Sequence, residues 1–566
     1  MIEKETILNV YRGKFFDGEW PSVIEMLSIT ASRFPQRPAF SVFDGEEKIT
    51  LNYSELLKRV YEVGSFLSEK GIKKGDRVVL NGKNSPAWGI SYLAIQAISA
   101  VVVPLDNQMP IERVNALSAF SEARAIFADK DVLEKVDPTL FEFQVELNGE
   151  FETIKGQAKI AKLPGENEIA AILYTSGTTG NEKGVVLTHG NFVSNVFQAS
   201  DPNFLNFTEE DVLYGLLPLH HSYSMTAVFL EAIKQGSELI FGSTLAVSKV
   251  LSEMRRGKIS LFLAIPLLYN KFLAGLMKKV KERGVVAYAL IRTLMVINGF
   301  MRKVFKVNPG RRWFHPLLDG IGMAHNRICI CGGGPLSPKT FQRYQQLGID
   351  FIQGYGLTET APILTLNPVS HFKVKSVGKV LPLIEMRIAD SDLLGVGEVQ
   401  VKGPNVCQGY YKDKKNTAQL FTEDGFLRTG DLGHLDKENY LYLKGRAKNL
   451  IVTEGGKNVY PEEIEDLFQL YGELDQVMVR GFMANKSAKA EGIEVLIYPN
   501  QEFCEDKSEE EVAREIEKIV REVNKKLVAY KKIAKTTILD KPMAMTSTKK
   551  IQRNKVARTI GRLLGS

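Results

Sequence analysis

The stretch Ile169-Ala-Ala-Ile-Leu-Tyr-Thr-Ser-Gly-Thr-Thr-Gly-Asn-Glu-Lys-Gly184 runs from an apolar strand pattern directly into a loop of Thr, Ser and Gly. Glycines let the backbone approach a ligand closely, and consecutive N–H groups can form an anion-binding nest. Hydroxyl groups and one ammonium group complete such a site. The alternative is a flexible surface loop, but the preceding strand favours a polyphosphate cradle. Its predicted members are Thr175, Ser176, Gly177, Thr178, Thr179, Gly180 and Lys183.

This loop is not a Walker A motif, because that motif requires Ser or Thr after its lysine and here Gly184 follows Lys183. An ordinary P-loop kinase or GTPase is therefore disfavoured. Around the loop, short β-branched runs such as Ala100-Val-Val-Val103 and Glu238-Leu-Ile-Phe241 alternate with amphipathic helical stretches. Such alternation predicts an α/β protein with largely parallel sheets covered by helices.

The length of 566 residues predicts two to four domains, since a domain commonly has about 150 residues. The last ~120 residues read as a compact α+β module, with a capping box at Ser508–Glu511 that opens an amphipathic helix. The segment Gly445-Arg-Ala-Lys-Asn449 joins the two parts. We predict a large domain of stacked mixed sheets over residues 1–447 and a small mobile domain over residues 448–566.

The charge is unevenly distributed. The chain carries 73 basic and 66 acidic residues, a net charge of +7. Residues 271–312 alone carry a net charge of +10 and residues 541–566 add +7, so the remainder is −10. The body is therefore acidic, and nucleic-acid binding is disfavoured because neither basic segment contains a recognised docking motif.

The composition, with 44% hydrophobic and 25% charged residues and four cysteines, excludes a disordered or disulfide-rich chain. Cys329 and Cys331 alternate with isoleucines and are predicted to pack in a core. The uncharged stretch from Asn84 to Leu105 contains prolines and ends in a Val run. A core helix followed by a strand is therefore expected, rather than a membrane span. No secretory pattern opens the sequence, and we expect a cytoplasmic protein.

Five further motifs accompany the loop in a fixed order: Leu217-Pro-Leu-His-His221, Gln353-Gly-Tyr-Gly-Leu-Thr-Glu359, Arg428-Thr-Gly-Asp-Leu432, Gly445-Arg-Ala-Lys-Asn-Leu-Ile451 and Met545-Thr-Ser-Thr-Lys-Lys-Ile-Gln-Arg553. Together they resemble the adenylate-forming superfamily, which comprises acyl-CoA synthetases, luciferases and the adenylation domains of peptide synthetases.

The resemblance implies roles for individual residues. Tyr355 would stack on adenine, and Gln353, Gly354, Gly356 and Gly333 would line the nucleotide site. Thr358 would contact phosphate. Glu359 would hold Mg²⁺ together with Thr175. Asp431 is suited to accept hydrogen bonds from both ribose hydroxyls, with Arg446 as a second ribose or phosphate ligand.

The remaining implied roles concern the acid, the thiol and domain movement. His221 would lie beside the acyl group, although a histidine packed in a loop is the alternative. Lys448 occupies the hinge position, and Gly455 and Gly456 would line the thiol tunnel. Lys550 matches the catalytic lysine. Lys549 stands where the family usually has glycine, and the run Lys550-Ile-Gln-Arg553 fits the motif better than a register that starts on Lys549. A basic tail that only binds anions is the alternative.

Two features concern the substrate. No Asp lies between Leu216 and Thr226 to pair with an amino group, which favours a simple carboxylic acid over an amino acid. The stretch between Pro266 and Arg327 resembles the extra segment of long-chain fatty acyl-CoA synthetases. Because the stretch is basic and amphipathic, it could lie on an anionic membrane, at the inner face of that membrane. A helical face exposed to solvent is the equally favoured alternative.

The implied function is ATP-dependent activation of a fatty acid through an acyl-adenylate to a CoA thioester, with ATP, Mg²⁺ and CoA taking part. A fatty acyl–acyl carrier protein synthetase is the first alternative, since an acidic carrier would suit a basic patch. A medium-chain or aryl acid CoA ligase comes next. A non-catalytic nucleotide- or lipid-binding relative is disfavoured, because it would not need Lys550.

Overall fold

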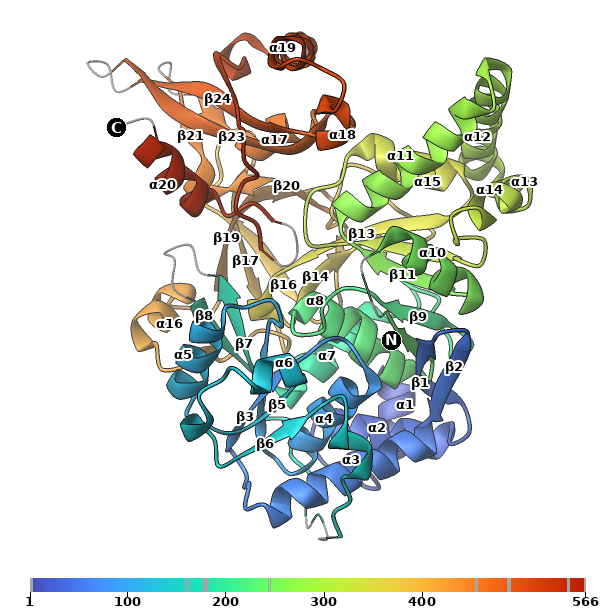
Figure 1. The fold of residues 1–566 in the computed structure, drawn as a ribbon, viewed down its shortest axis with the longest axis vertical. Helices are drawn as coiled ribbons and strands as arrows, with labels where there is room; N and C mark the ends of the chain where they lie inside the picture. The colour runs from blue at the N-terminus through green and yellow to red at the C-terminus, as the bar shows by residue number, and fades with distance from the viewer. Residues whose placement is uncertain are drawn as a thin grey trace.

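The computed structural model describes residues 4–157, 160, 162–176, 182–242, 244, 246–453, 457–485, 490–546 and 550–563. Two mixed sheets form the N-terminal body (Figure 1). One orders its strands β18-β8-β7-β4-β3-β5-β6. Their bounds are β18 (Gly409–Tyr410), β8 (Glu182–Thr188), β7 (Ile169–Ser176), β4 (Val101–Leu105), β3 (Arg77–Asn81), β5 (Ala123–Ala128) and β6 (Phe143–Glu146).

The second sheet has the order β15-β14-β13-β12-β11-β9-β10-β1-β2. Its strands are β15 (Lys379–Val380), β14 (Ile363–Leu366), β13 (Asp350–Gly356), β12 (Ile328–Cys331), β11 (Leu261–Ala264), β9 (Val212–Gly215), β10 (Glu238–Phe241), β1 (Pro38–Asp44) and β2 (Glu47–Asn52). The interior pairs of both sheets are parallel, whereas β2, β14 and β8 pair antiparallel. The predicted α/β class with mixed sheets is confirmed.

Helices cover both sheets. They are α1 (Lys4–Tyr11), α2 (Val23–Arg33), α3 (Tyr53–Glu69), α4 (Pro86–Ala97), α5 (Ile111–Ser121), α6 (Lys130–Leu133), α7 (His189–Ala199), α8 (Ser222–Ser224), α9 (Glu231–Gln235), α10 (Val247–Arg256), α11 (Pro266–Glu282), α12 (Val285–Phe305), α13 (Gly310–Trp313), α14 (His315–Asp319), α15 (Pro338–Gln346) and α16 (Lys414–Leu420).

Helix α4 shows how the two sheets are joined. It contacts β1 of one sheet and β3 and β4 of the other. A side chain at Gly89 would lie 2.9–3.3 Å from the rings of Phe40, Phe229 and Phe241, so only glycine allows this close packing. The helix is apolar on all sides because every side of it is covered. The prediction of a core helix and strand over Asn84–Leu105 is confirmed, as is core packing of Cys329 and Cys331.

A smaller antiparallel sheet follows, with the order β16-β17-β19-β20: β16 (Glu385–Ala389), β17 (Gly397–Lys402), β19 (Leu427–Leu435) and β20 (Leu441–Arg446). A short turn at Ala447–Asn449 leads from β20 into the C-terminal module. That module holds β21 (Ile451–Val452), β22 (Asn458–Val459), β23 (Leu474–Asn485), β24 (Ala490–Pro499), β25 (Lys535–Ile538), α17 (Pro461–Glu465), α18 (Gln501–Cys504), α19 (Glu509–Asn524) and α20 (Arg553–Leu563).

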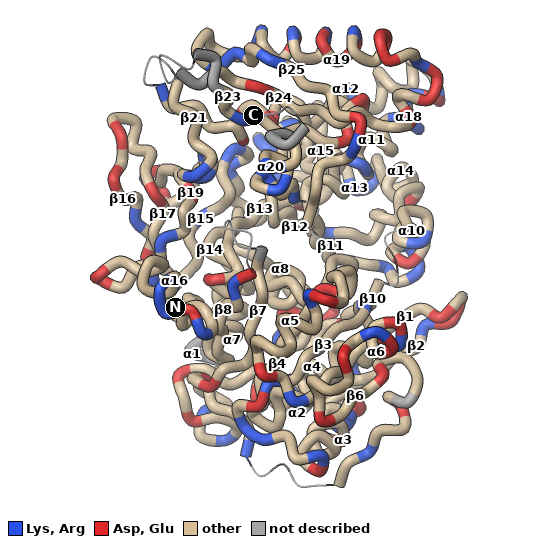
Figure 2. The backbone as a smooth tube through the Cα atoms, turned by 60° about the vertical axis from the view of Figure 1, so that its left-hand side comes forward, with Lys and Arg blue, Asp and Glu red and all other residues tan. Residues whose placement is uncertain are grey.

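The C-terminal module has its own core, in which the buried face of α19 packs on β24. The predicted capping box is confirmed: Ser508 Oγ accepts from the backbone N–H of Glu511, whose carboxylate accepts from the N–H of Ser508. Figure 2 shows mixed charges along α19, whereas α20 carries basic residues. The second basic segment therefore includes an exposed helix as well as Lys550.

An ion pair with a buried carboxylate ties together the starts of three neighbouring interior strands of the second sheet, β9, β11 and β12. The carboxylate of Asp211, 3% exposed, accepts a bond from Arg327 Nε at 2.7 Å and one from Ser260 Oγ at 2.6 Å. We expect Asp211→Ala to destabilise the N-terminal domain by about 3 kcal/mol, because it leaves the guanidinium without its partner. The measurement is urea denaturation followed by tryptophan fluorescence.

The matched control is Asp424→Ala, which breaks an ion pair with Arg387 whose side chains are 54% and 41% exposed. Solvent already screens that pair, so the denaturation midpoint should stay nearly unchanged. Equal midpoints for the two variants would show that Asp211 does not anchor the sheet.

Candidate functional site

A large cleft lies where the large domain meets the C-terminal module. It has a volume of about 2730 Å³ and is lined by residues of both sheets, of β19 and β20, and of the 545–555 segment. A pocket for one small ligand commonly occupies about 300–1,000 Å³. The cleft is therefore large enough for a nucleotide and a second substrate together.

Tyr355, Asp431 and Arg446 form one hydrogen-bonded group in this cleft. Tyr355 Oη donates to Asp431 Oδ2 at 2.6 Å, and Arg446 Nε lies 2.9 Å from Asp431 Oδ1. Asp431 on β19 and Arg446 on β20 are direct cross-strand neighbours. Burial raises the pKa of Tyr355 and the Asp431 charge adds to it, while that same charge raises the pKa of Arg446. A carboxylate has about four acceptor positions, so Asp431 keeps capacity for a ligand.

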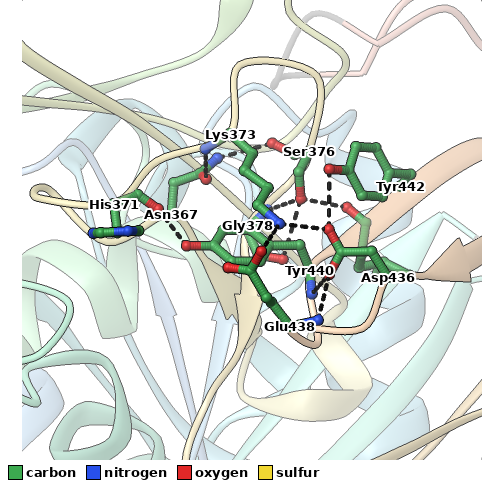
Figure 3. Close-up of polar contacts among 10 residues, drawn as sticks. Asn367, His371, Lys373, Ser376, Gly378, Asp436, Glu438, Tyr440 and Tyr442 are labelled. Atoms are coloured by element: carbon green, nitrogen blue, oxygen red, sulfur yellow. Dashed lines mark hydrogen bonds and ion pairs between the residues drawn. The ribbon is translucent and has the colours of Figure 1, made fainter. Parts of the chain in front are cut away.

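A polar network fixes the two strands that carry Asp431 and Arg446 (Figure 3). Lys373, from the loop after β14, donates to Asp436 Oδ2 at 2.8 Å and to Glu438 Oε1 at 2.9 Å. Both acceptors lie in the turn between β19 and β20. Ser376 Oγ donates to the carbonyl of Leu441 at 2.7 Å. The network therefore ties the loop after β14 to the turn that joins β19 and β20.

Glu359 and Thr358 lie at the start of the short helical turn that follows β13. Glu359 Oε1 accepts a hydrogen bond from Tyr410 Oη at 2.9 Å, and Thr358 Oγ1 lies 3.1 Å from Ser222 Oγ. Burial and the Glu359 charge both raise the pKa of Tyr410, so it stays a hydrogen-bond donor. The Glu359 carboxylate retains acceptor positions beyond this bond. Its oxygen and the Thr175 hydroxyl, which also lines the cleft, have the donor chemistry that Mg²⁺ prefers.

Lys183, at the end of the glycine-rich loop, also lies beside Tyr410. Its Nζ is 4.7 Å from the centre of the Tyr410 ring and donates to Asn416 Oδ1 at 3.0 Å. Thr175 and Ser176 end β7, and Lys183 stands on the neighbouring strand β8. The predicted loop residues Gly177, Thr178, Thr179 and Gly180 lie outside the described residues, as do Gly455 and Gly456.

His221 and Lys550 approach the cleft from different domains. The rings of His220 and His221 are 4.2 Å apart, and His220 Nε2 lies 3.7 Å from Asp106 Oδ2. Burial and the neighbouring His220 lower the pKa of His221, which keeps its imidazole neutral at pH 7. Lys550 keeps an exposed surface, but it stands inside the cleft. The resulting desolvation and the charge of Arg446 lower its pKa.

The C-terminal module is fastened to the body beside this cleft. Gln469 accepts a hydrogen bond from the backbone N–H of Ser337 at 2.8 Å and donates to the carbonyl of Pro335 at 3.1 Å. Two hydrogen bonds with Thr546 position Lys550: the Lys550 N–H donates to Thr546 Oγ1 at 3.1 Å, and the Thr546 N–H donates to the Lys550 carbonyl at 2.8 Å. Lys448 lies in the connecting turn, where burial and then Arg446 lower its pKa.

The predicted glycines have packing roles as well. A side chain at Gly356 would come within 1.7 Å of the Pro362 carbonyl, and one at Gly354 within 3.1 Å of the Thr365 carbonyl. These glycines therefore let β13 approach the following strand. Gly333, with φ +78°, and Gln353 on β13 line the cleft wall. The structure thus brings the predicted residues of the described ranges to one cleft, except Ser176, which ends β7 and is not part of the cleft lining.

Sequence reasoning missed Tyr410, Asn416, Ser222 and Gln469. Tyr410 reaches its place because β18 pairs with β8, with Gly409 opposite Val186, more than 200 positions away in sequence. No local pattern distinguishes Tyr410 from its neighbour Tyr411. Tyr410 could have been found only by predicting that β18 pairs with β8.

We expect Tyr410→Phe to weaken the binding of Mg²⁺ at Glu359. Without this hydroxyl, Glu359 loses the hydrogen bond that orients its carboxylate. A residue that hydrogen-bonds to a metal ligand in this way commonly contributes about 10- to 100-fold to metal affinity or activity. The Mg²⁺ concentration that gives half-maximal pyrophosphate release should rise by about 10-fold. Tyr411→Phe is the control, since the Tyr411 hydroxyl donates to the Ser121 carbonyl instead. An unchanged Mg²⁺ requirement in Tyr410→Phe would contradict this role.

Comparisons with known proteins show the family of the chain. The AMP-binding enzyme family profile matches residues 27–411, and the profile of the AMP-binding enzyme C-terminal domain matches residues 448–561. A 2-succinylbenzoate–CoA ligase of Listeria innocua is 27% identical over 522 residues, 91% of this chain and 95% of that protein. The long-chain-fatty-acid–CoA ligase FadD15 of Mycobacterium bovis is 28% identical over 443 residues, 73% of this chain and 72% of that protein.

Among solved structures, an ATP-bound chimera of RpMatB and BxBclM superposes with a TM-score of 0.75 at 25% identity, covering 95% of this chain and 99% of the chimera. The predicted resemblance to the adenylate-forming superfamily is confirmed. The chain belongs to the AMP-binding enzyme family.

Proposed function

We propose that this protein is an AMP-forming acid–CoA ligase whose acid is a long-chain fatty acid. The observation that carries the proposal is the position of Lys550. A lysine of the C-terminal module stands in one cleft with Asp431 and Arg446, beside the Glu359 site. Such a set of groups suits a reaction in which a carboxylate attacks a polyphosphate, and a protein that only binds nucleotide would not require it.

In the first half-reaction, the acid's carboxylate oxygen attacks the α-phosphorus of ATP. A new P–O bond forms, the bond to pyrophosphate breaks, and acyl-adenylate results. Asp431 and Arg446 bind the ribose, and Tyr355 orients Asp431 through its hydroxyl. The Lys550 ammonium offsets the repulsion between the two anions. Glu359 and Thr175 would hold Mg²⁺, which supplies further positive charge to the phosphates when bound.

In the second half-reaction, the CoA thiol attacks the carbonyl carbon of the acyl-adenylate: a C–S bond forms, the C–O bond to AMP breaks, AMP leaves with the electron pair, and the thiol proton passes to solvent. For the first half-reaction, the neutral imidazole of His221 suits a place beside the carboxylate of the acid, because a cationic imidazole there would stabilise that anion in its ground state. Movement of residues 448–566 about Lys448 would take Lys550 away and admit the thiol. This movement is part of the proposal, as is the domain boundary on which it depends.

The choice of a fatty acid is supported by the walls of the cleft. Besides the polar groups, the lining includes an apolar set: Leu205, Phe207, Ala227, Leu261, Leu263, Ile330 and Leu366. Helix α11 adds Leu267, Ala274 and Met277 to this lining. An aliphatic chain buries well against such surfaces. The similarity to a long-chain-fatty-acid–CoA ligase over 73% of the chain supports the same substrate.

An aryl carboxylic acid is the second candidate. It is favoured by the similarity to a 2-succinylbenzoate–CoA ligase, which extends over 95% of that protein. An aromatic acid would need less of the apolar lining than an aliphatic chain. Acyl carrier protein in place of CoA remains the alternative thiol acceptor within this proposal.

The deciding experiment is pyrophosphate release with aliphatic acids of increasing length and with aryl acids, each measured with CoA and with a holo carrier protein. We expect release to increase with chain length and thioester to form with CoA. Preference for an aryl acid would replace the fatty-acid substrate, thioester formed only on the carrier would replace CoA, and no release with any acid would overturn the proposal.

A further inference from the structure

Helix α12 exposes a continuous apolar face to solvent. Its inner side packs on the body through Met295 and Asn298, which are buried. On the opposite side, Val286, Leu290, Ile297, Phe300 and Val304 are 42–82% exposed. Their spacing of three, four or seven residues places them on one side of a helix, together with Thr293. We call these six residues the outer face of α12.

This exposure is concentrated in one segment of the molecule. In the part of the chain that the structure describes, ten of the 22 exposed large apolar side chains lie within residues 285–313. Scattered single residues of this kind are normal on a soluble protein, but a contiguous patch marks an interaction surface. Figure 1 shows α12 at the outer edge of the molecule, with α11 between it and the central strands.

Basic residues frame this apolar face at both ends of the helix. Before the helix stand Lys278, Lys279, Lys281 and Arg283. Lys303 lies in its last turn, and Lys306 and Arg312 follow it; all seven side chains are exposed. Glu282 is the one acidic residue between 271 and 312 in the sequence. An apolar stripe with basic ends complements a surface that has an apolar interior and anionic headgroups, which is the chemistry of an anionic lipid bilayer.

The contacts between α12 and the body favour a helix that lies on the membrane surface over one that spans the membrane. With 21 apolar-rich residues, α12 is long enough to span a bilayer by length and composition. However, Asn298 donates to the Gln346 carbonyl at 2.9 Å and accepts from the Gly310 N–H at 2.9 Å. Arg302 forms an ion pair with Asp350 on the same inner side. Insertion across the bilayer would break these bonds and leave their charged groups in the hydrocarbon.

We propose that the outer face of α12 docks on an anionic lipid bilayer, with its apolar side chains at the acyl boundary and its basic ends at the headgroups. Helix α11 pairs with α12 and also lines the cleft, through Leu267, Ala274 and Met277. Docking therefore brings one wall of the cleft to the surface in which long-chain acids partition. This last step rests on the proposed fatty-acid substrate, whereas the docking itself does not.

The test is co-sedimentation of the full-length protein with vesicles of phosphatidylcholine, with and without phosphatidylglycerol. We expect binding to vesicles that contain phosphatidylglycerol, weakening as salt is raised. The variant L290S/I297S/F300S should bind at least about 10-fold more weakly, because three exposed apolar side chains are lost. The variant K303Q/K306Q/R312Q should lose about 10²-fold at low salt, since each basic residue near an anionic surface contributes several-fold.

The matched control is L393S/L394S, which removes two exposed leucines at 106% and 83% exposure from a distant loop. It should bind vesicles like the wild type. Unchanged binding of the α12 serine variant, or no binding of the wild type, would overturn the proposal. A dimer detected by sedimentation and abolished by the serine variant, without vesicle binding, would assign this face to a second copy of the chain instead.

Pyrophosphate release with a water-soluble short acid separates this proposal from the proposed function. Both the serine and the glutamine triple variants should retain this activity, because the substituted side chains lie outside the cleft lining. Vesicle binding without release from any acid would leave the docking surface intact and overturn the ligase. Pyrophosphate release without vesicle binding would support the ligase and overturn the docking surface.

Discussion

Replacing Lys550 by alanine should reduce acid-dependent pyrophosphate release by about 10²–10³-fold, the loss commonly seen when one charge-stabilising group is removed from a transition state. Lys550 is a cation of the C-terminal module that lies in the cleft near Arg446 and His221. Conversion of preformed acyl-adenylate to thioester should be largely retained, because no polyphosphate takes part in that step. The two half-reactions are measured separately, by pyrophosphate release and by thiol consumption.

Two further variants make this result specific. Lys549→Ala, which alters the preceding residue, should retain adenylation. If this variant loses activity and Lys550→Ala does not, the register of the motif is wrong. Lys550→Arg keeps the charge at every accessible pH. Since desolvation lowers the Lys550 pKa from its ordinary 10.5, adenylation by the wild type should decline in alkaline solution before that pH, and Lys550→Arg should not show this decline. Equal loss of both half-reactions in Lys550→Ala would contradict the assignment.

The sequence predicted those parts of the site that lie in short contiguous motifs. Tyr355, Asp431, Arg446 and Lys550 each stand within a run of residues with a recognisable order, and the structure brings them to one cleft. The contacts that hold them depend on pairing between distant segments. Tyr410 reaches Glu359 from 51 positions away, and Lys183 reaches Asn416 from 233. Such contacts follow from sheet order, which local patterns do not encode.

The two apolar helices α4 and α12 show a second limit. Both have few polar residues, and by composition each could be a core element or a membrane element. The turn residues around α4 and the Val run of β4 predicted burial correctly, because a strand pattern beside a helix implies that a sheet covers it. For α12 the sequence did not decide between a helical face exposed to solvent and one that faces a membrane. Its exposed face became visible only when α11 and α15 were seen to cover one side alone.

Replacing Asp431 by alanine should lower kcat/KM for ATP by about 10²-fold or more, since hydrogen bonds to a charged group contribute about 1.5–3 kcal/mol each. The variant removes the proposed acceptor of the ribose hydroxyls and also leaves Arg446 and Tyr355 without their shared partner. Asp431→Asn separates these effects, because it keeps the shape and an acceptor for Tyr355 while removing the charge. Thermal unfolding of both variants checks that the β19–β20 pair remains intact.

A cycle with modified nucleotide then tests the contact itself. In the wild type, 2′-deoxy-ATP and 3′-deoxy-ATP should each react about 10-fold or more less efficiently than ATP, because each lacks one hydroxyl that Asp431 would accept from. In Asp431→Ala the three nucleotides should react with nearly equal kcat/KM, since the acceptor that distinguishes them is gone. If the deoxy penalties persist undiminished in the variant, another group binds the ribose. Asp431 would then serve only to orient Arg446 and Tyr355.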